Sequence, residues 1–334
     1  MKTKKTKTGT SRIAWISLLW MAAVAPVVAK PVNTILTTIT GLDEPYGVVV
    51  SPDSSTAYVA EHGSNYVAAI NATTYAVTQH GLTGYYVTDL ALSPNGETLW
   101  VTDDQPTGYV IGFSTSNFQQ TTDTLTGTSN PFGLAVSPNG NELYVASQGD
   151  NKVYVYSTAG SGSLIKSLKV GINPADIAFT PNGEAAYVTN ISSSTVSVIN
   201  VATNKIKGLP ISVGEDPCGI NISPSGTIVY VVNLTSVSVI KDREIIATVD
   251  LSSYGAHTGY FSALTPDGKY LYVPMDQTDS KDGSVAVINT ATKAVATKFT
   301  VGIGPVAVAI APNGEQAYVT NYTDGSVTVV RITE

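Results

Sequence analysis

The chain has 334 residues, of which 43% are apolar and only 13% charged, with one cysteine and three histidines. This length suits one large all-β domain or two smaller ones, and the abundance of Val, Thr, Tyr, Ser and Gly favours strands and turns over helices. The single Cys218 excludes an internal disulfide, so packing must stabilise the fold even in an oxidising compartment.

The first 29 residues have the pattern of a secretory signal peptide. Five basic residues precede the apolar stretch 13–25, and Val-Val-Ala at 27–29 offers a cleavage position. The apolar stretch is short for a membrane span, with an uncleaved anchor as the alternative. We therefore expect a leader at 1–29 and a single domain at 30–334 without a further membrane span. The protein is then periplasmic, secreted or at the cell surface.

Removal of the leader makes the protein more acidic. The leader carries five of the 18 basic residues and no acidic residue, so residues 30–334 hold 13 basic and 25 acidic residues, a net charge of −12. Such a charge repels nucleic acid phosphates unless a basic stripe is segregated on one face, and no such stripe stands out. The sequence therefore argues against nucleic acid as a partner.

A unit of 42 to 46 residues is repeated seven times. Each copy has an apolar run, a turn such as "SPNG" or "TPDG", a strand built on an aromatic residue, an alternating segment and a more polar segment. The turn prolines mark the copies: Pro52, Pro94, Pro138, Pro181, Pro224, Pro266 and Pro312. Four strands in a repeat of this length predict an all-β, seven-bladed β-propeller with four-stranded antiparallel blades.

The two ends of the repeat array predict how the ring closes. The last unit stops after its third strand, at "SVTVVRITE", whereas residues 32–40 form an unmatched strand placed where a fourth strand would stand. We expect residues 32–40 to complete the seventh blade and so to remove an open sheet edge. A solenoid with free ends is the alternative.

The phrase "YVTN" occurs at 187–190 and at 318–321, each time after a "PNG" turn and before Val-rich alternation. This pattern, over residues 32–334, resembles the YVTN-repeat β-propeller family. The resemblance implies an exported bacterial or archaeal propeller, with some relatives linked to surface layers or to DNA binding, and it implies no catalytic residues. We interpret the phrase as structural. Its Tyr and Val build inter-blade packing, and Asn190, Asn233 and Asn321 bond backbone amides of the following turn.

Function is expected where the repeats differ, in the loops that join second to third strands and fourth to first strands. These loops share one face, the top face. They hold twelve carboxylates: Asp43, Glu44, Glu61, Asp103, Asp104, Asp150, Glu215, Asp216, Asp276, Asp279, Asp282 and Asp324. Tyr46, Tyr86, Phe132 and Tyr260 fall near the channel mouth. The predicted ligand-binding residues are Glu44, Tyr46, Glu61, His62, Tyr86, Asp103, Asp104, Asp216, His257 and Tyr260.

An acidic face with aromatic residues suits a cation, a cationic or sugar ligand, or a basic patch of a cell-envelope protein. Solvated loops that only keep the protein soluble are the alternative. The lengthened loop "MDQTDSKDG" spaces Asp276, Asp279 and Asp282 by three residues, which makes calcium a candidate cofactor although the spacing is not that of an EF-hand.

The sequence has no G-x-S-x-G, no H-E-x-x-H and no Cys/His metal cluster. Glu61, His62, Asp103 and Asp104 are candidates for acid–base or metal chemistry only by analogy, because propeller lactonases and lyases work at this end of the channel. Cys218 is expected to be a buried small hydrophobe rather than a reactive thiol. The leading function is non-catalytic binding or scaffolding. A lactonase-like hydrolase or lyase and a nucleic-acid-binding propeller stay open as alternatives.

Overall fold

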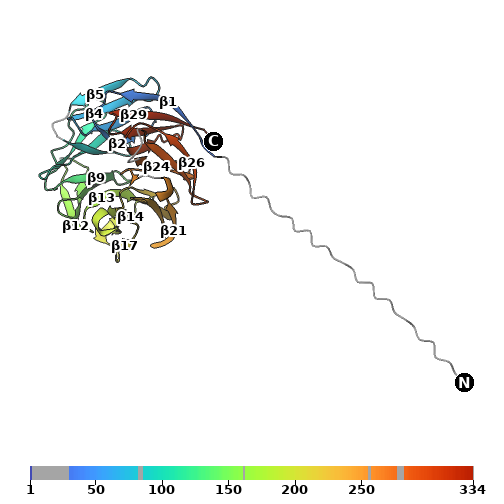
Figure 1. Cartoon of the computed structure of the whole chain (residues 1–334). Helices are drawn as coiled ribbons and strands as arrows, with labels where there is room; N and C mark the ends of the chain where they lie inside the picture. The colour runs from blue at the N-terminus through green and yellow to red at the C-terminus, as the bar shows by residue number, and fades with distance from the viewer. Residues whose placement is uncertain (2–29, 82–85, 161, 255–256, 277–281, 334) are drawn as a thin grey trace.

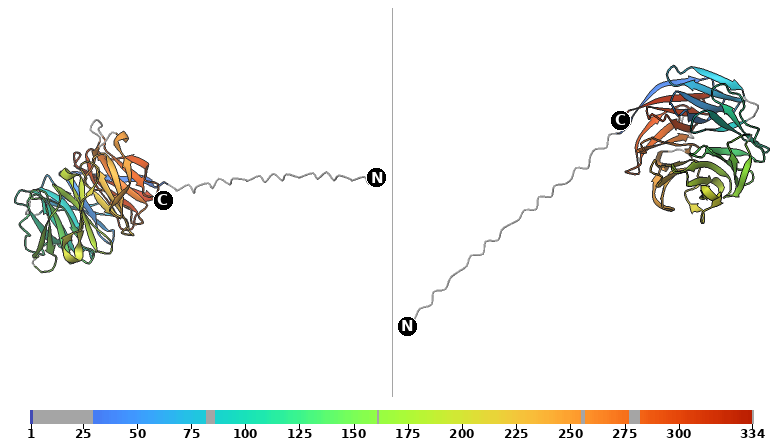
Figure 2. Two further views of the ribbon diagram at one scale, coloured as in Figure 1. Left: turned by 90° about the horizontal axis from the view of Figure 1, so that it is seen from below. Right: turned by 180° about the vertical axis from the view of Figure 1, so that it is seen from behind.

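The structure is a computed structural model, and it describes residues 1, 30–81, 86–160, 162–254, 257–276 and 282–333. Seven antiparallel sheets stand around a central axis, and the chain passes once around the ring from blue to red in Figure 1. Figure 2 shows the same ring from below and from behind. The fold is therefore the all-β, seven-bladed β-propeller that the repeat predicts.

Blades are numbered in chain order, and strands are given from the axis outward. Blade 1 consists of β2 (Pro45–Val50), β3 (Thr56–Glu61), β4 (Tyr66–Asn71) and β5 (Val77–Gly81). Blade 2 consists of β6 (Val87–Leu92), β7 (Thr98–Asp103) and β8 (Tyr109–Ser114), with isolated bridges to Gln120 and Leu125 at its outer edge. Blade 3 consists of β9 (Pro131–Val136), β10 (Glu142–Ser147), β11 (Lys152–Ser157) and β12 (Leu164–Lys169).

Blade 4 consists of β13 (Pro174–Phe179), β14 (Ala185–Asn190) and β15 (Thr195–Asn200), with β16 (Lys205–Ile206) and β17 (Ile211–Ser212) both paired to β15. Blade 5 consists of β18 (Ile220–Ile222), β19 (Ile228–Asn233), β20 (Ser236–Lys241) and β21 (Glu244–Asp250). In blade 6 the inner position is shared by β22 (His257–Thr258) and β23 (Ala263–Leu264), followed by β24 (Tyr270–Asp276), β25 (Ser284–Asn289) and β26 (Ala294–Thr300). Blade 7 consists of β27 (Pro305–Ile310), β28 (Gln316–Asn321), β29 (Ser326–Thr333) and β1 (Val32–Thr40).

Helix is almost absent. The described part of the chain has three short 3₁₀ segments, η1 (Ile191–Ser193), η2 (Val201–Thr203) and η3 (Ser252–Tyr254). Across the same residues, no helix has the length and apolar character needed to cross a membrane.

The ring closes through the N-terminal strand, as predicted. β1 pairs antiparallel with β29 along its whole length, with one bulge after Ile35, and the two strands are labelled next to each other in Figure 1. The Tyr272 hydroxyl of blade 6 donates a hydrogen bond to Asn33 Oδ1 at 2.7 Å. The N-terminal strand therefore supplies the outer strand of the last blade and covers the open edge of β29.

The cores lie between neighbouring blades. The aromatic residue of the second strand is buried there, as in Trp100, Tyr144 and Tyr318, whose side chains are almost fully excluded from solvent. Tyr318 of blade 7 packs into one cluster with Val59 and Ile70 of blade 1. Each inner strand has neighbours on both faces, which explains why its sequence is a nearly continuous apolar run.

The repeated phrase is structural, as predicted, and its threonine has a role that the sequence analysis did not assign. Thr320 Oγ1 donates to the backbone oxygen of Tyr46 in the next blade at 2.6 Å. Thr189 makes the equivalent bond to the Cys218 oxygen at 2.9 Å. These hydroxyls therefore tie neighbouring blades together near the top face.

The asparagines turn inward, so the expected bonding to backbone amides of the following turn is wrong for all three. The side-chain amides of Asn190, Asn233 and Asn321 donate to hydroxyls of the third strand, on Ser197, Ser238 and Thr328. Within the described residues, Asn190 alone of the three also accepts a backbone N–H, from Gly171 at 3.0 Å. The reason is that each third strand offers a hydroxyl directly beside the asparagine.

Candidate functional site

Aromatic rings from three blades meet over the axis at the top face. The ring centroid of Tyr46 on β2 lies 5.9 Å from that of Phe132 on β9, 5.6 Å from Tyr260 and 6.3 Å from Phe261. Blades 1, 3 and 6 stand on different sides of the axis, so these contacts close the upper end of the channel. We call Tyr46, Phe132, Tyr260 and Phe261 the aromatic plug. Burial raises the pKa of Tyr46, whose hydroxyl shares a hydrogen bond with Tyr260.

A carboxylate, an imidazole and a phenol meet beside the plug. Glu44 precedes β2 and His62 follows β3, and these strands are neighbours, so the two side chains come together. His62 Nδ1 lies 3.4 Å from Glu44 Oε2, and the Tyr322 hydroxyl donates to the same oxygen at 2.7 Å. Burial, together with the Glu44 carboxylate, raises the pKa of Tyr322 to about 12. Tyr86 packs against the His62 ring at 5.3 Å between centroids.

Asp104, directly after β7, also belongs to this side of the mouth. Burial raises its pKa, while a hydrogen bond from Asn130 and the nearby His62 act in the opposite direction. Its Oδ1 atom is buried and has no hydrogen-bond partner among the described residues. Asp104 is therefore a carboxylate with one oxygen still able to accept a bond.

Three of the predicted ligand-binding residues, Asp216, His257 and Tyr260, line a cavity at the top of blades 5, 6 and 7, here called the top pocket. It has a volume of about 340 Å³. Its wall includes Asp216, His257, Tyr260, Asp276 and Tyr322, together with apolar residues such as Leu234 and Val306. His257 on β22 stands directly opposite Asp276 on β24 in the sheet register. No lysine or arginine lines this cavity in the part of the chain that the structure describes.

Cys218 forms part of the wall of the top pocket and is buried, as expected. Burial, with smaller effects of the Asp216 and Asp176 carboxylates, raises its pKa to about 12. Its Sγ lies 3.3 Å from the backbone oxygen of Asp216. The thiol is therefore protonated at neutral pH and is not an activated nucleophile.

Glu61 and Asp103, both predicted to bind a ligand, are buried instead. Their exposed fractions are 1% and 3%. Glu61 accepts hydrogen bonds from Gln79 Nε2 at 2.8 and 3.0 Å and from the Asp43 N–H at 3.0 Å. Gln105 Nε2 lies 3.3 Å from Asp103 Oδ1. Both residues occupy the asparagine position of the repeated phrase, whose side chain turns into the blade.

The acid–base alternative built on Glu61, His62, Asp103 and Asp104 is weakened by this burial, because two of its four members are held inside their blades.

Only two of the three residues predicted to bind calcium lie in the described part of the chain. Asp276 and Asp282 are exposed, whereas Asp279 lies outside the described residues. No cluster of three or more His, Cys, Asp or Glu side chains suited to a metal occurs in the described ranges. The calcium site remains a prediction.

Two carboxyls on inner strands, the buried Asp89 and the half-buried Asp176, were missed by the sequence analysis. Asp89 on β6 accepts from the Leu134 N–H at 3.2 Å, and Asp176 on β13 accepts from the Ile220 N–H at 2.9 Å, each across to the next blade. Burial raises the pKa of both, that of Asp176 to about 7. They stand five residues before the turn proline, where the following unit has glycine. This alternation of Asp and Gly at one position of the repeat could have revealed the two carboxyls from the sequence.

Comparison with protein families gives a match within residues 56–210. The model of "Lactonase, 7-bladed beta-propeller" matches residues 56–173 and residues 111–210. Residues 111–173 occur in both alignments, which is what a repeated blade produces when the model fits in two registers. The matched ranges contain His62 and Asp104 but not Glu44. They also leave out every residue of the top pocket from Asp216 onward. A comparison with curated proteins finds no match.

Two solved structures are similar in fold. Hydrazine synthase of Kuenenia stuttgartiensis superposes with a TM-score of 0.76 at 20% identity, covering 88% of this chain and 97% of that one. The Cps50 (Swd1) β-propeller domain of Myceliophteria thermophila has a TM-score of 0.77 at 11% identity, covering 90% of this chain and all of that one. At these identities the likeness shows the propeller fold alone. The chain is a seven-bladed β-propeller whose residues 56–210, in blades 1 to 4, are similar to the lactonase model.

Proposed function

We propose that this protein is an exported, non-catalytic binding propeller that takes an organic cation in the top pocket. The observation that carries the proposal is the wall of that pocket, where Asp216 and Asp276 stand with Tyr260 and Tyr322 and, among the described residues, no lysine or arginine. The export part of the proposal rests on the leader-like residues 1–29.

The chemistry of the wall favours a methylated or substituted ammonium group. Carboxylates attract the positive charge, and the face of a tyrosine ring adds about 0.5 to 2 kcal/mol for a cation placed over it. Tyr260 is 38% exposed, so its ring is accessible to a ligand. Because Asp216 and Asp276 are exposed, their contribution is screened by water and salt, and we expect a dissociation constant on the order of 0.1 to 1 mM.

The same wall disfavours anionic ligands. A phosphate or carboxylate group would meet two carboxylates and no lysine or arginine among the described residues of the wall. The net charge of −12 for residues 30–334 acts in the same direction at longer range. The proposal therefore includes weak or absent binding of nucleic acid.

Calorimetric titration with tetramethylammonium chloride tests the proposal. Asp216 has a φ of +46°, which asparagine tolerates well, so Asp216→Asn is expected to fold normally. The variant should bind tetramethylammonium three- to tenfold more weakly than the wild type. Asp123→Asn is the matched control, since Asp123 is exposed and lies outside the pocket. Equal affinities for the wild type and Asp216→Asn would contradict the proposal.

A second candidate function is hydrolysis of a neutral lactone beside the plug. One observation favours it: Glu44 Oε2 lies 3.4 Å from His62 Nδ1, an arrangement in which a carboxylate orients an imidazole that activates water. The match to the lactonase model supports this candidate. Initial rates with δ-valerolactone, compared between wild type and His62→Asn, decide it. A rate no higher than the spontaneous one for the wild type removes this candidate.

A further inference from the structure

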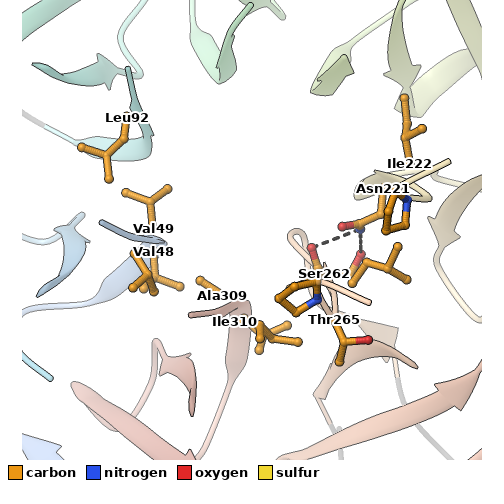
Figure 3. A pocket seen from close by; sticks show the side chains of 15 residues that line it. Val48, Val49, Leu92, Asn221, Ile222, Ser262, Thr265, Ala309 and Ile310 are labelled. Atoms are coloured by element: carbon orange, nitrogen blue, oxygen red, sulfur yellow. Dashed lines mark hydrogen bonds between the residues drawn. The ribbon is translucent and has the colours of Figure 1, made fainter. Parts of the chain in front are cut away.

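A second cavity lies in the channel below the aromatic plug (Figure 3). Its volume is about 540 Å³, and it shares no lining residue with the top pocket. Inner strands of blades 1, 2, 5, 6 and 7 form its wall. The turn residues Pro224 and Pro266 also line it, which places its opening at the face opposite the plug. We call this space the lower channel.

Most side chains in the wall of the lower channel are apolar and none of the lining residues is charged, while backbone polar groups supply much of the exposed surface. Twelve of the 15 lining residues are aliphatic or proline, and the others are Asn221, Ser262 and Thr265. Thr265 is already engaged, because its hydroxyl donates to Asp267 and accepts from the Tyr270 N–H. Asn221 and Ser262 are therefore the lining residues whose side chains can offer hydrogen bonds to a ligand.

Asn221 and Ser262 are polar at two positions of the repeat where the other blades carry apolar residues. The residue three before the turn proline pairs with the aromatic of the second strand in every blade, and it is Val49, Ala91, Ala135, Ala178, Asn221, Ala263 and Ala309 in blades 1 to 7. The residue four before the proline is Val48, Leu90, Leu134, Ile177, Ile220, Ser262 and Val308. Since repeats differ where they carry individual information, the two polar substitutions need a reason.

The two exceptions touch each other. Asn221 Nδ2 donates to Ser262 Oγ at 2.6 Å and to the Ser262 backbone oxygen at 3.1 Å, as drawn in Figure 3. Within the described residues, Asn221 Oδ1 accepts no hydrogen bond and the Ser262 hydroxyl proton has no acceptor. The pair thus offers one side-chain acceptor and one side-chain donor next to each other, in a channel whose other wall side chains are mostly apolar.

A purely structural role is the competing explanation. The Asn221–Ser262 bond joins blades 5 and 6, much as Asp89 and Asp176 join other blades. However, blades 6 and 7 and blades 7 and 1 pack together without such a side-chain pair at these two positions, where they carry Ala, Val or Ser. A structural tie also leaves unexplained why the unused donor and acceptor belong to residues that line a cavity.

We propose that the lower channel binds a neutral molecule with an apolar body and one hydroxyl group, which bonds to Asn221 and Ser262. A hydroxyl group donates to Asn221 Oδ1 while its oxygen accepts the Ser262 proton, so a single group satisfies both. The volume lies in the range of small-molecule sites. None of the 15 described residues that line the cavity is charged, so the wall offers a carboxylate or ammonium on the ligand no ion pair in exchange for the hydration that it loses.

Equilibrium dialysis of the whole protein with three fluorescent probes tests this. The probes are 2-naphthalenemethanol, 2-methylnaphthalene without the hydroxyl, and 2-naphthoate with a charge. We expect saturable binding of one 2-naphthalenemethanol per chain, about tenfold weaker binding of 2-methylnaphthalene, and no binding of 2-naphthoate. Asn221→Ala should weaken 2-naphthalenemethanol about tenfold and leave 2-methylnaphthalene unchanged.

Variants that fill the lower channel with a larger side chain test whether the probes bind there. Ala309→Phe, and Ile310→Trp nearer the opening as a second filling variant, should each abolish binding of both neutral probes while circular dichroism shows a folded protein. Leu209→Asn is the control for non-specific adsorption, since Leu209 is 84% exposed. Undiminished binding in a folded filling variant, or no saturable binding of either neutral probe to the wild type, overturns the proposal. Equal loss of both neutral probes in Asn221→Ala overturns the assigned role of the Asn221–Ser262 pair.

Discussion

The Oδ2 atom of Asp176 on β13 accepts a hydrogen bond from the backbone N–H of Ile220 on β18, 2.9 Å away, and so ties blade 4 to blade 5. Asp176 Oδ1 accepts a second N–H, from Ile177 at 2.7 Å. Asp89 makes the same kind of bond from blade 2 to blade 3, at Leu134. These carboxyls are placed on the innermost strands, where burial raises the pKa of each.

The first prediction concerns pH. Burial raises the pKa of Asp176 from 3.8 to about 7, so the folded state binds its proton more tightly than the unfolded state. The stability that this group contributes is fully present below pH 3.8 and is lost as the pH rises through 7. The loss is at most roughly 4 kcal/mol, at about 1.4 kcal/mol per unit of pKa shift.

Asp176→Asn removes this pH dependence. Urea unfolding from pH 4 to pH 8 should show that the wild type loses free energy of unfolding relative to Asp176→Asn as the pH rises. Asp123→Asn is the control and should run parallel to the wild type. A difference between wild type and Asp176→Asn that stays constant from pH 4 to pH 8 is the contradictory result.

The second prediction concerns the glycine that faces this tie. A Cβ added at Gly133 would stand 2.1 Å from the backbone oxygen of Ala175 in the next blade, so the two inner strands must move apart. Gly133→Ala should lower the free energy of unfolding by roughly 2 to 3 kcal/mol. Gly81→Ala is the control, because its nearest neighbour would be a Tyr66 ring atom at 3.4 Å, an ordinary contact. Similar stabilities of the two variants in urea would argue against tight inter-blade packing.

The third prediction concerns closure. A protein that begins at Asp43 lacks β1, leaves the edge of β29 unpaired and loses the bond from Tyr272 to Asn33. Its melting temperature should fall by roughly 10 °C or more, with aggregation through the free edge. Scanning calorimetry and light scattering measure both effects. A monomeric truncated protein with an unchanged melting temperature would refute closure through β1.

The fourth prediction concerns the aromatic plug. Tyr46→Phe keeps the ring contacts with Phe132 and Tyr260 and loses only the hydroxyl, so it should cost about 1 kcal/mol. Tyr46→Ala empties the centre of the plug and should cost about 3 to 5 kcal/mol. Urea unfolding of the two variants provides the test. Equal losses of free energy of unfolding in the two variants would show that the ring contacts of Tyr46 do not stabilise the plug.

The fold was predictable from the sequence because each feature of the repeat determines the structure of a short segment. The turn proline, the aromatic of the second strand and the Val-rich alternation each specify a short segment, and seven copies reinforce one another. The unpaired strand at 32–40 pointed to closure for the same reason, since the last copy lacks a fourth strand. Nothing in these features depends on which way a loop side chain points.

The site was harder to predict, because side-chain direction at the end of a strand decides it. Glu61 and Asp103 read as loop carboxylates, yet they occupy the position whose side chain turns into the blade. Asp89 and Asp176 were overlooked because they lie within apolar runs. Asn221 and Ser262 become noticeable only when the seven inner strands are aligned and their contact is known. Tyr322 directly follows a repeated phrase that had been assigned to structure alone.

The most direct test of the central claim is calorimetric titration with tetramethylammonium at 20 and 200 mM sodium chloride, on the wild type and on the Asp216→Asn, Asp276→Asn double variant. Both carboxylates line the top pocket and are exposed, so their attraction for a cation should be strong at low salt and screened at high salt. The account predicts measurable binding to the wild type that weakens several-fold at the higher salt, and at least tenfold weaker binding to the double variant at the lower salt. No binding to the wild type at 20 mM salt, or binding that neither salt nor the double substitution changes, would contradict it.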